Sequence, residues 1–295
     1  VEQPQALHTA MRRVRYAWAG PLDDAAVAER MLAENQALTV VNTRRHAREL
    51  FGLIRGTPGA FHLSAAMTPA HRTQVLTDIR AALADKQPCR VVATQVVECG
   101  VDVSLPVVLR SLAGLDSIIQ AGGRCNRSGE RDEAVVTVFS APDHPVPSLW
   151  TEHANLARRV LTEKFPADPA SPQAVAWYFQ ELFRTQNLDA NNICDLLKAN
   201  RDLAFAFRTA AQAFQLIEGG QVDVTIPRDA DAQALIRRLE SEGPSPEVLR
   251  TLQPHTVQIR PRQAKALGGA LRLVRERVWV LDSDAYDPEL GVAAD

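Results

Sequence analysis

Short apolar runs alternate with longer amphipathic stretches through the first 140 residues, and this alternation limits the fold more than any other feature of the sequence. The strands that we expect are 12–18, 38–41, 61–63, 90–94, 107–109 and 135–139. The helices that we expect between them are 23–35, 44–51, 69–87 and 117–127. Apolar runs this short suit strands that are covered on both faces. We therefore expect an α/β lobe with a mainly parallel sheet and helices on both faces.

Polar side chains follow three of the expected strands at the point where each one ends. Asn42 and Thr43 follow the second strand, Ser64 the third, and Thr94 and Gln95 the fourth. Small hydroxyl and amide groups are ordinary helix N-caps, and each position taken alone favours that interpretation. The carboxyl ends of parallel strands lie at one edge of a sheet, where such groups can donate hydrogen bonds to phosphate oxygens. Their recurrence at three strand ends therefore favours a track for a phosphodiester backbone.

A second polar group lies in the segment 116–127, which reads as a helix with Asp116 as its N-cap. Arg124 and Arg127 are three residues apart, with Gln120 one turn earlier, so all three should share one helix face. Two nearby guanidinium groups repel one another, and arginine matches phosphate with two parallel hydrogen bonds. A solvated basic helix end is the alternative. The spacing, directly after a buried strand, favours phosphate chemistry.

These residues resemble a known family. The segment 94–102 is similar to the fifth motif of superfamily 2 helicases, and 116–127 is similar to the sixth. More narrowly, 123–127 resembles the CRISPR-associated helicase–nuclease of type I systems, with subtype I-C as the suggested subtype. The resemblance covers the second motor lobe and the tail that follows it. It implies a RecA-like lobe, a linker helix and an accessory C-terminal domain.

The resemblance also implies roles for individual residues. Arg124 and Arg127 would be arginine fingers, with Gln120 as a third catalytic residue. Gly100, Asp102 and Gly123 would bind nucleotide. The DNA contacts would be Asn42, Thr43, Ser64, Thr94 and Gln95.

Several motifs of the whole enzyme are missing from the sequence. No lysine follows a glycine, so there is no Walker A loop, and there is no His-Asp dipeptide of the kind that binds nuclease metals in the family. We therefore expect ATP and Mg²⁺ to bind jointly with an absent first lobe, and nuclease metal ions to bind only in an absent domain. The implied partners are single-stranded DNA, an RNA-guided surveillance complex and the N-terminal nuclease and first helicase lobe. An anti-CRISPR inhibitor that mimics DNA is a further candidate.

The composition of the chain limits which binding sites and which cellular locations are plausible. The net charge of −2 gives no global signature of nucleic-acid binding, so a DNA surface must be local. The four cysteines (Cys89, Cys99, Cys125 and Cys194) form no Cys-x-x-Cys pair, and the seven histidines are scattered, so we expect no metal site. Reduced thiols favour the cytoplasm. No apolar run is long enough for a membrane span.

The texture changes after residue 140. We expect residues 1–140 to form the lobe, 141–175 a proline-rich linker with a helix at 148–165, and 176–295 a small mixed α/β C-terminal domain with a hairpin around Gly219 and Gly220. The function implied is an ATP-dependent single-stranded-DNA translocase that is linked to a nuclease and degrades foreign DNA. Two alternatives stay open: a non-enzymatic module that docks DNA or an effector complex, and a lobe of an RNA-remodelling helicase.

Overall fold

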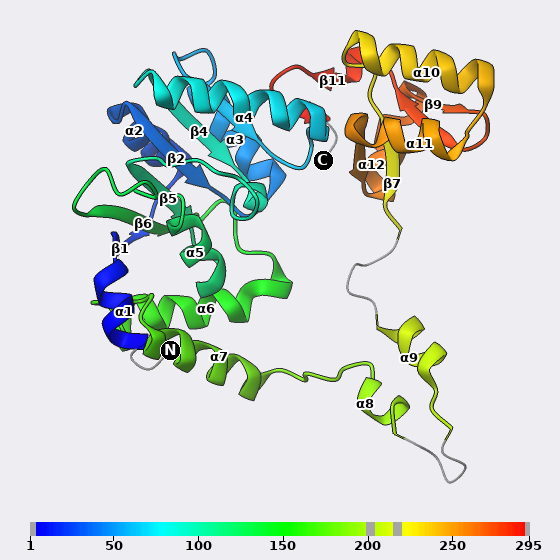
Figure 1. Ribbon diagram of the computed structural model, residues 1–295. Helices are drawn as coiled ribbons and strands as arrows, with labels where there is room; N and C mark the ends of the chain where they lie inside the picture. Colours follow the sequence, from blue (N-terminus) through cyan, green and yellow to red (C-terminus); the bar gives the residue numbers. More distant parts are fainter. Residues whose placement is uncertain (1–3, 199–203, 215–219, 293–295) are drawn as a thin grey trace.

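The computed structural model describes residues 4–198, 204–214 and 220–292. Its largest part is a six-stranded sheet with the strand order β1-β6-β5-β2-β4-β3, in which each neighbouring pair is parallel (Figure 1). The strands are β1 (Val14–Pro21), β2 (Gln36–Val40), β3 (Ala60–Leu63), β4 (Cys89–Ala93), β5 (Val107–Ser111) and β6 (Ala134–Ser140). The predicted parallel α/β lobe is thus confirmed.

Helices cover both faces of this sheet. Val91 and Val92 are neighbours in β4 but belong to two different apolar clusters, because successive side chains of a strand point to opposite faces. One cluster lies under α2 (Asp24–Ala33) and α3 (Arg44–Ile54). The other lies under four helices, α4 (Pro69–Ala84), α5 (Leu115–Gly122), α6 (Thr151–Arg159) and α7 (Pro172–Thr185).

The helix that carries the sixth motif is shorter than the sequence predicted. Gly114, rather than Asp116, is the N-cap of α5, and the helix ends at Gly122. Arg124 and Arg127 therefore lie in the turn that follows the helix, and the prediction that they share a helix face was wrong. Two successive glycines explain the early end, because glycine is a poor helix former and a favoured helix terminator.

The segment after β6 returns to the same lobe. Residues 148–165 form a 3₁₀ turn (Ser148–Trp150), α6 and a π-helical turn (Val160–Lys164) in place of one regular helix. Helix α7 packs against α6 and against α1 (Pro4–Met11), and its Tyr178 is fully buried. The boundary that we placed at residue 175 falls inside α7. How the chain divides into separately folding domains stays a prediction.

A second, smaller sheet follows α8 (Ile193–Leu196) and α9 (Phe207–Ala213). Its strand order is β8-β7-β10-β9, with one parallel pair and two antiparallel pairs, so it is mixed as predicted. The strands are β7 (Val222–Thr225), β8 (Thr256–Ile259), β9 (Leu271–Val274) and β10 (Val278–Leu281), and the helices are α10 (Ala230–Glu242), α11 (Pro246–Leu252) and α12 (Pro261–Leu267). The hairpin expected around Gly219 lies partly outside the described residues, and β7 pairs instead with β8 and β10.

The last described residues lead back to the large lobe. They form a small antiparallel pair, β11 (Tyr286–Asp287) and β12 (Gly291–Val292). The Tyr286 hydroxyl lies 2.8 Å from His71 Nδ1, and the Val292 N–H donates to the Ala66 carbonyl oxygen at 2.9 Å. A Cβ on Gly291 would clash with the Ala66 backbone, and its φ of +86° also requires glycine. This tail therefore ties the two parts together beside β3 and α4.

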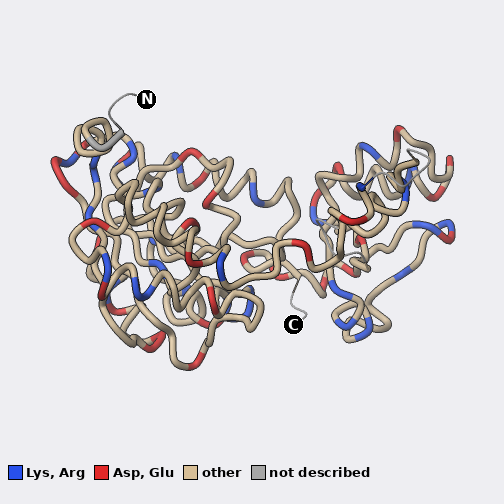
Figure 2. The backbone as a smooth tube through the Cα atoms, turned by 90° about the horizontal axis from the view of Figure 1, so that it is seen from below, with Lys and Arg blue, Asp and Glu red and all other residues tan. Residues whose placement is uncertain are grey.

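Positively and negatively charged residues are interspersed along both parts of the chain (Figure 2). None of the described helices is long and apolar enough to cross a membrane.

Candidate functional site

The residues singled out in the sequence fall into two groups at opposite edges of the large sheet. The polar groups that follow β2, β3 and β4 lie at its carboxyl-terminal edge. Arg124 lies at the other edge, because Leu105, just before β5, forms a parallel bridge with Cys125 and donates its N–H to the Arg124 carbonyl oxygen. Helix α5 runs from one edge to the other. The structure therefore gives the two groups separate surroundings, which we call the strand-end group (Asn42, Thr43, Ser64, Thr94 and Gln95) and the arginine turn (residues 123–127).

The arginine turn holds a loop of the fifth motif. Arg124 donates from Nη2 to the Glu98 carbonyl oxygen at 2.9 Å and from Nη1 to the carbonyl oxygen of Val101. Arg127 donates from Nε to Asp102 Oδ1 at 2.8 Å. This ion pair is open to water, with 47% of the Arg127 side chain and 82% of the Asp102 side chain exposed. An exposed pair contributes little to stability, so Arg127 can be released to another anion at low cost.

The remaining residues of this group shape the turn. Gln120, in the last turn of α5, accepts a weak hydrogen bond from the Cys99 thiol at 3.3 Å. Gly100 has a φ of +71°, which glycine adopts without strain. A Cβ on Gly122 would lie 2.2 Å from the Tyr16 hydroxyl, so this glycine is needed for packing against β1. A Cβ on Gly123 would meet only the backbone of its own helix, at 3.2 Å.

Several members of the strand-end group bond within the protein. Thr43 caps α3 by accepting the His46 N–H at 3.1 Å, yet its own hydroxyl proton stays free to donate. Asn42 is committed on both sides of its amide: it donates to the Leu112 carbonyl oxygen and accepts from Arg110. Ser64 is fully buried and accepts the Ala66 N–H, so it cannot reach a DNA strand in this conformation, contrary to our expectation.

Thr94 and Gln95 lie where β4 ends. Thr94 is 4% exposed and makes no capping bond with its side chain. Gln95 is half-buried, and its amide donates to the Asn42 carbonyl oxygen at 3.2 Å. Of the strand-end group, Thr43 and Gln95 therefore combine partial exposure with donor capacity.

A buried network joins the two groups, and sequence reasoning missed it. Arg110 in β5 is fully buried and donates to Asn42 Oδ1 at 2.8 Å. Its other terminal nitrogen lies 3.1 Å from Glu98 Oε1, and Ser117 bridges the pair with two bonds of 2.8 Å. Burial raises the pKa of Glu98, and the Arg110 charge and the Ser117 hydroxyl partly offset this increase. Because the Glu98 carbonyl oxygen also accepts from Arg124, the network runs from the strand-end group to the arginine turn.

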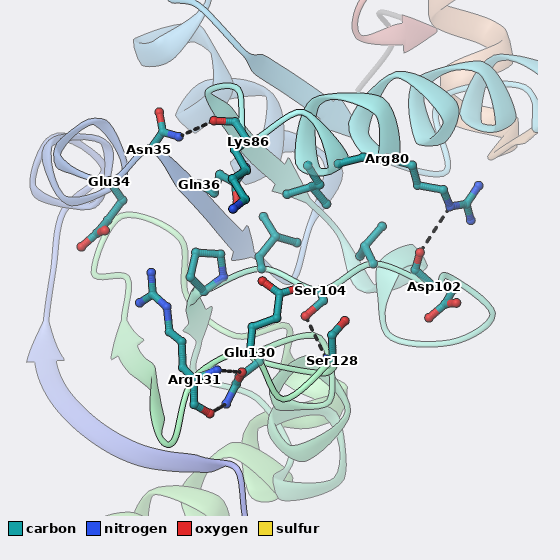
Figure 3. A pocket seen from close by; sticks show the side chains of 16 residues that line it. Glu34, Asn35, Gln36, Arg80, Lys86, Asp102, Ser104, Ser128, Glu130 and Arg131 are labelled. Atoms are coloured by element: carbon teal, nitrogen blue, oxygen red, sulfur yellow. Dashed lines mark hydrogen bonds between the residues drawn. The ribbon is translucent and has the colours of Figure 1, made fainter.

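A pocket of about 500 Å³ opens beside this loop at the amino-terminal edge of the sheet. Figure 3 shows Asp102 and Ser104 on one wall, with the Arg80 guanidinium donating to the Asp102 carbonyl oxygen. Glu34 and Glu130 also line it, and the described lining includes neither Arg124 nor Arg127. The mixture of acids and bases makes it a poor anion site, so we do not place a phosphate there.

A second missed feature is basic. A groove of about 550 Å³ between the large lobe and the smaller sheet is lined by Arg44 and Arg72 from the lobe and by residues of β7 and β8. Burial, followed by the charges of Arg260 and Arg72, lowers the pKa of Arg44. Arg44 directly follows Thr43 in the chain, and the charges of Arg72 and Arg260 are close enough to act on it. The signal was visible in the sequence as Arg44 directly after Thr43, but the contributions of Arg72 and Arg260 required the fold.

Two scattered histidines also meet, contrary to what their spacing suggested. His46 and His144 stack with ring centroids 4.0 Å apart, and both contact Asp24. Each follows a strand of the large sheet and so lies at its carboxyl-terminal edge, but their meeting depends on the order of the strands.

With this geometry in place, comparison with known proteins is informative. Residues 33–130 match the family described as CRISPR-associated nuclease/helicase Cas3, C-terminal. The chain is 34% identical over 180 residues to the CRISPR-associated nuclease/helicase Cas3 of Haloferax volcanii, a match that covers 52% of this chain and 18% of that protein. It is 20% identical over 168 residues to the protein of the same name from Methanothermobacter thermautotrophicus, covering 56% and 20%. The chain thus spans about a fifth of the length of these relatives.

Solved structures agree at the level of the fold. Cas3 of T. fusca with ADP superposes with a TM-score of 0.59 at 17% identity, over 95% of this chain and 42% of that one. A chain from a CRISPR RNA-guided surveillance complex in a pre-nicking state gives a TM-score of 0.56 at 17% identity, covering 95% and 44%. The matched coverage includes both sheets. Residues 33–130 are thus similar to the C-terminal part of Cas3 proteins, and the fold of the chain is similar to that of solved Cas3 structures.

Proposed function

We propose that this chain is the C-terminal part of an ATP-dependent translocase on single-stranded DNA that is joined to a nuclease, and that the whole protein degrades foreign DNA in type I CRISPR interference. The observation that carries the proposal is the separation of the two groups: a water-exposed arginine turn at one edge of the sheet, donor groups at the other, and a buried network between them. A motor needs two such surfaces, since nucleotide and strand bind apart and must affect each other.

The arginine turn supports the nucleotide half of the proposal. Arg127 is held by a single solvated carboxylate, so a phosphate group can replace Asp102 as its partner. Arg124 is more engaged, because its terminal nitrogens bind loop carbonyl oxygens, and it orients the loop around Gly100. The first lobe would supply the phosphate loop and the carboxylates for Mg²⁺, and the ion would neutralise charge on the phosphates. The Cas3 structures solved with ATP, ADP and AMPPNP are consistent with this assignment.

The strand-end group and the basic groove support the DNA half. Thr43 has a free hydroxyl proton, and Gln95 is half-exposed beside it. Arg44, which follows Thr43 in the chain, and Arg72 line the groove between the lobe and the smaller sheet. The described lining of the groove has two arginines and one carboxylate, that of Asp223, and this excess of positive charge strengthens its hold on a polyanion such as a phosphodiester strand. The likeness to a chain of a surveillance complex supports recruitment by an RNA-guided complex.

ATP turnover by the full-length protein tests the nucleotide half. Arg127→Ala should lower the DNA-stimulated kcat by about 10³-fold or more, the scale of an arginine finger, with ATP affinity changed only a few-fold. Arg238→Ala, which removes an exposed arginine paired with Glu242 at 2.7 Å, is the matched control and should leave both values unchanged. The 295-residue chain alone should not turn over ATP until the first lobe is added.

The same assay separates the proposal from an RNA-remodelling lobe. Single-stranded DNA should stimulate hydrolysis by the full-length protein, and RNA of the same sequence should stimulate it far less. Equal or greater stimulation by RNA would favour the remodelling helicase. Near-normal hydrolysis in Arg127→Ala would remove the finger assignment and leave a docking module as the better account.

A further inference from the structure

We propose that Asp24, His46 and His144 form a binding site for one divalent transition-metal ion, with Zn²⁺ as the first candidate and Glu49 at its rim. One ligand atom from each of the three residues lies within 4.8 Å of the others. The site is separate from the arginine turn and from the basic groove, and it does not depend on the translocase proposal.

Three elements bring the ligands together. Asp24 is the first residue of α2, His46 lies in the first turn of α3, and His144 lies in the segment that follows β6. The strands before them, β1, β2 and β6, end at the same edge of the sheet. Two ligands are therefore fixed on helices, where their positions are well defined, and the third comes from the proline-rich segment 141–147.

The distances suit a metal as well as hydrogen bonds. His46 Nε2 lies 2.9 Å from Asp24 Oδ1, and His144 Nε2 lies 3.1 Å from Asp24 Oδ2. Ligand atoms around a tetrahedral Zn²⁺ with bonds near 2.0–2.1 Å are about 3.3 Å apart. Small shifts would therefore open the cluster enough for an ion. Imidazole nitrogen with carboxylate oxygen is a set that Zn²⁺ and its neighbours accept, whereas Mg²⁺ prefers oxygen and water.

The charges also favour a cation. His144 Nε2 faces two carboxylates, since Glu49 Oε2 lies 3.3 Å away in addition to Asp24, and one N–H cannot satisfy both fully. His46 is 1% exposed and His144 is 9% exposed, so the imidazoles are shielded from water while the Glu49 side chain remains 44% exposed. The imidazole nitrogens would therefore hold the ion from the buried side. Glu49 or a water molecule could complete its coordination from the exposed side.

A bound ion would have a structural effect. It would tie the segment 141–147 to the starts of α2 and α3, and that segment leads directly into the helices that connect the lobe with the rest of the chain. The ion would therefore fix the direction in which the chain leaves the large sheet.

Metal titration of the untagged 295-residue chain tests the site, using Co²⁺ as a spectroscopic probe and Zn²⁺ as its competitor. After removal of metal with a chelator, we expect visible absorption of bound Co²⁺ that saturates at one equivalent and disappears when Zn²⁺ is added. His144→Gln and Asp24→Asn should each weaken uptake by at least about tenfold, and Glu49→Gln should weaken it less. The melting temperature of the chain should rise with Zn²⁺ and stay constant in the first two variants.

His8→Gln is the matched control. His8 also faces a carboxylate, Asp168 at 3.0 Å, but within the described part of the chain it belongs to no cluster of metal-ligating groups, so its loss should leave Co²⁺ uptake unchanged. Melting of every variant in chelator shows whether the fold is intact. The proposal would be overturned if the unchanged chain took up no Co²⁺, or no more than His144→Gln does. The cluster would then be a set of hydrogen bonds without a metal ion.

Discussion

The two edges of the large sheet carry similar polar residues but use them differently. At the carboxyl-terminal edge, the side chains of Asn42 and Ser64 form hydrogen bonds within the protein. The C-terminal tail, which contains β11 and β12, covers the region beside β3. At the amino-terminal edge, the one hydrogen-bond partner that the described residues give the Arg127 side chain is the solvent-exposed carboxylate of Asp102. The first edge is largely committed to the fold, whereas the second remains available to a ligand.

This difference shows that residue type alone does not identify a ligand-binding group. Thr43 and Ser64 read alike in the sequence as hydroxyls at strand ends, but one is half-exposed and the other is buried. Arg110 and Arg127 are both arginines near the motifs, but one is an internal support and the other is open to water.

The largest effect on stability is expected at Arg110, the centre of the buried network. Arg110→Met removes the partner of Glu98 and leaves a carboxyl group in the core, so we expect a loss of about 3–5 kcal/mol in the free energy of unfolding. Denaturant unfolding of the chain measures it. The double variant Arg110→Met with Glu98→Gln should recover part of the loss. If Arg110→Met costs no more than Arg238→Met, which removes an exposed arginine, the network is not the support that we describe.

The second largest effect is expected from acid, which should lower the stability of the carboxyl-terminal edge of the sheet. Burial lowers the pKa of His62 and of His71 to about 4, and nearby positive charge adds to the effect. In the unfolded chain these histidines have a pKa near 6.5 and take up protons more readily than in the folded chain. Their contribution to the free energy of unfolding is therefore fully present above pH 6.5 and is lost as the pH drops towards 4. Each histidine sets an upper bound of about 3 kcal/mol on this loss. Unfolding curves at several pH values check the direction.

His71→Phe separates the two contributions. His71 accepts from the Tyr286 hydroxyl, so this variant should weaken attachment of the tail at neutral pH while flattening the acid dependence. An unchanged slope between pH 6.5 and 4 would mean that His71 is not the group that titrates.

The smallest effect is expected at the last residue of α5, just before the arginine turn. Gly122→Ala places a methyl group against Tyr16, and overpacking of this kind costs about 1–3 kcal/mol. Gly52→Ala, in α3 with open space around it, is the control and should stabilise the chain by about 0.5–1 kcal/mol. Thermal or denaturant unfolding compares them. Equal behaviour of the two variants would contradict the close contact between α5 and β1.

Most of the lobe could be predicted because its strands are mainly apolar and most of its helices have clear start signals. The six strands appeared within a few residues of their expected positions, and Pro69 opened a helix as expected. The end of α5 was missed because the arginine spacing was given more weight than the two glycines before it. Sequence alone could not show the burial of Ser64, since the residues that cover this region lie more than 200 positions later in the chain.

The polar residues of the candidate site could be singled out from the sequence, but the contacts between them could not. Arg124, Arg127 and Asp102 were found from motif spacing, and the structure brings the last two into contact. Arg110 escaped notice because a single arginine within an apolar strand gives no pattern. The meeting of Asp24, His46 and His144 depends on the order of the strands, which a parallel sheet does not fix from its sequence pattern.

The most direct test measures kcat for ATP and the Kd for single-stranded DNA in two variants of the full-length protein. Arg127→Ala should lose about 10³-fold or more in kcat and keep its DNA affinity, because its guanidinium lies at the edge away from the strand-end group. Thr43→Val should instead weaken DNA binding several-fold, with ATP affinity retained. Near-normal DNA-stimulated hydrolysis by Arg127→Ala, or equal loss of DNA affinity in both variants, would contradict the assignment of the two edges to two ligands.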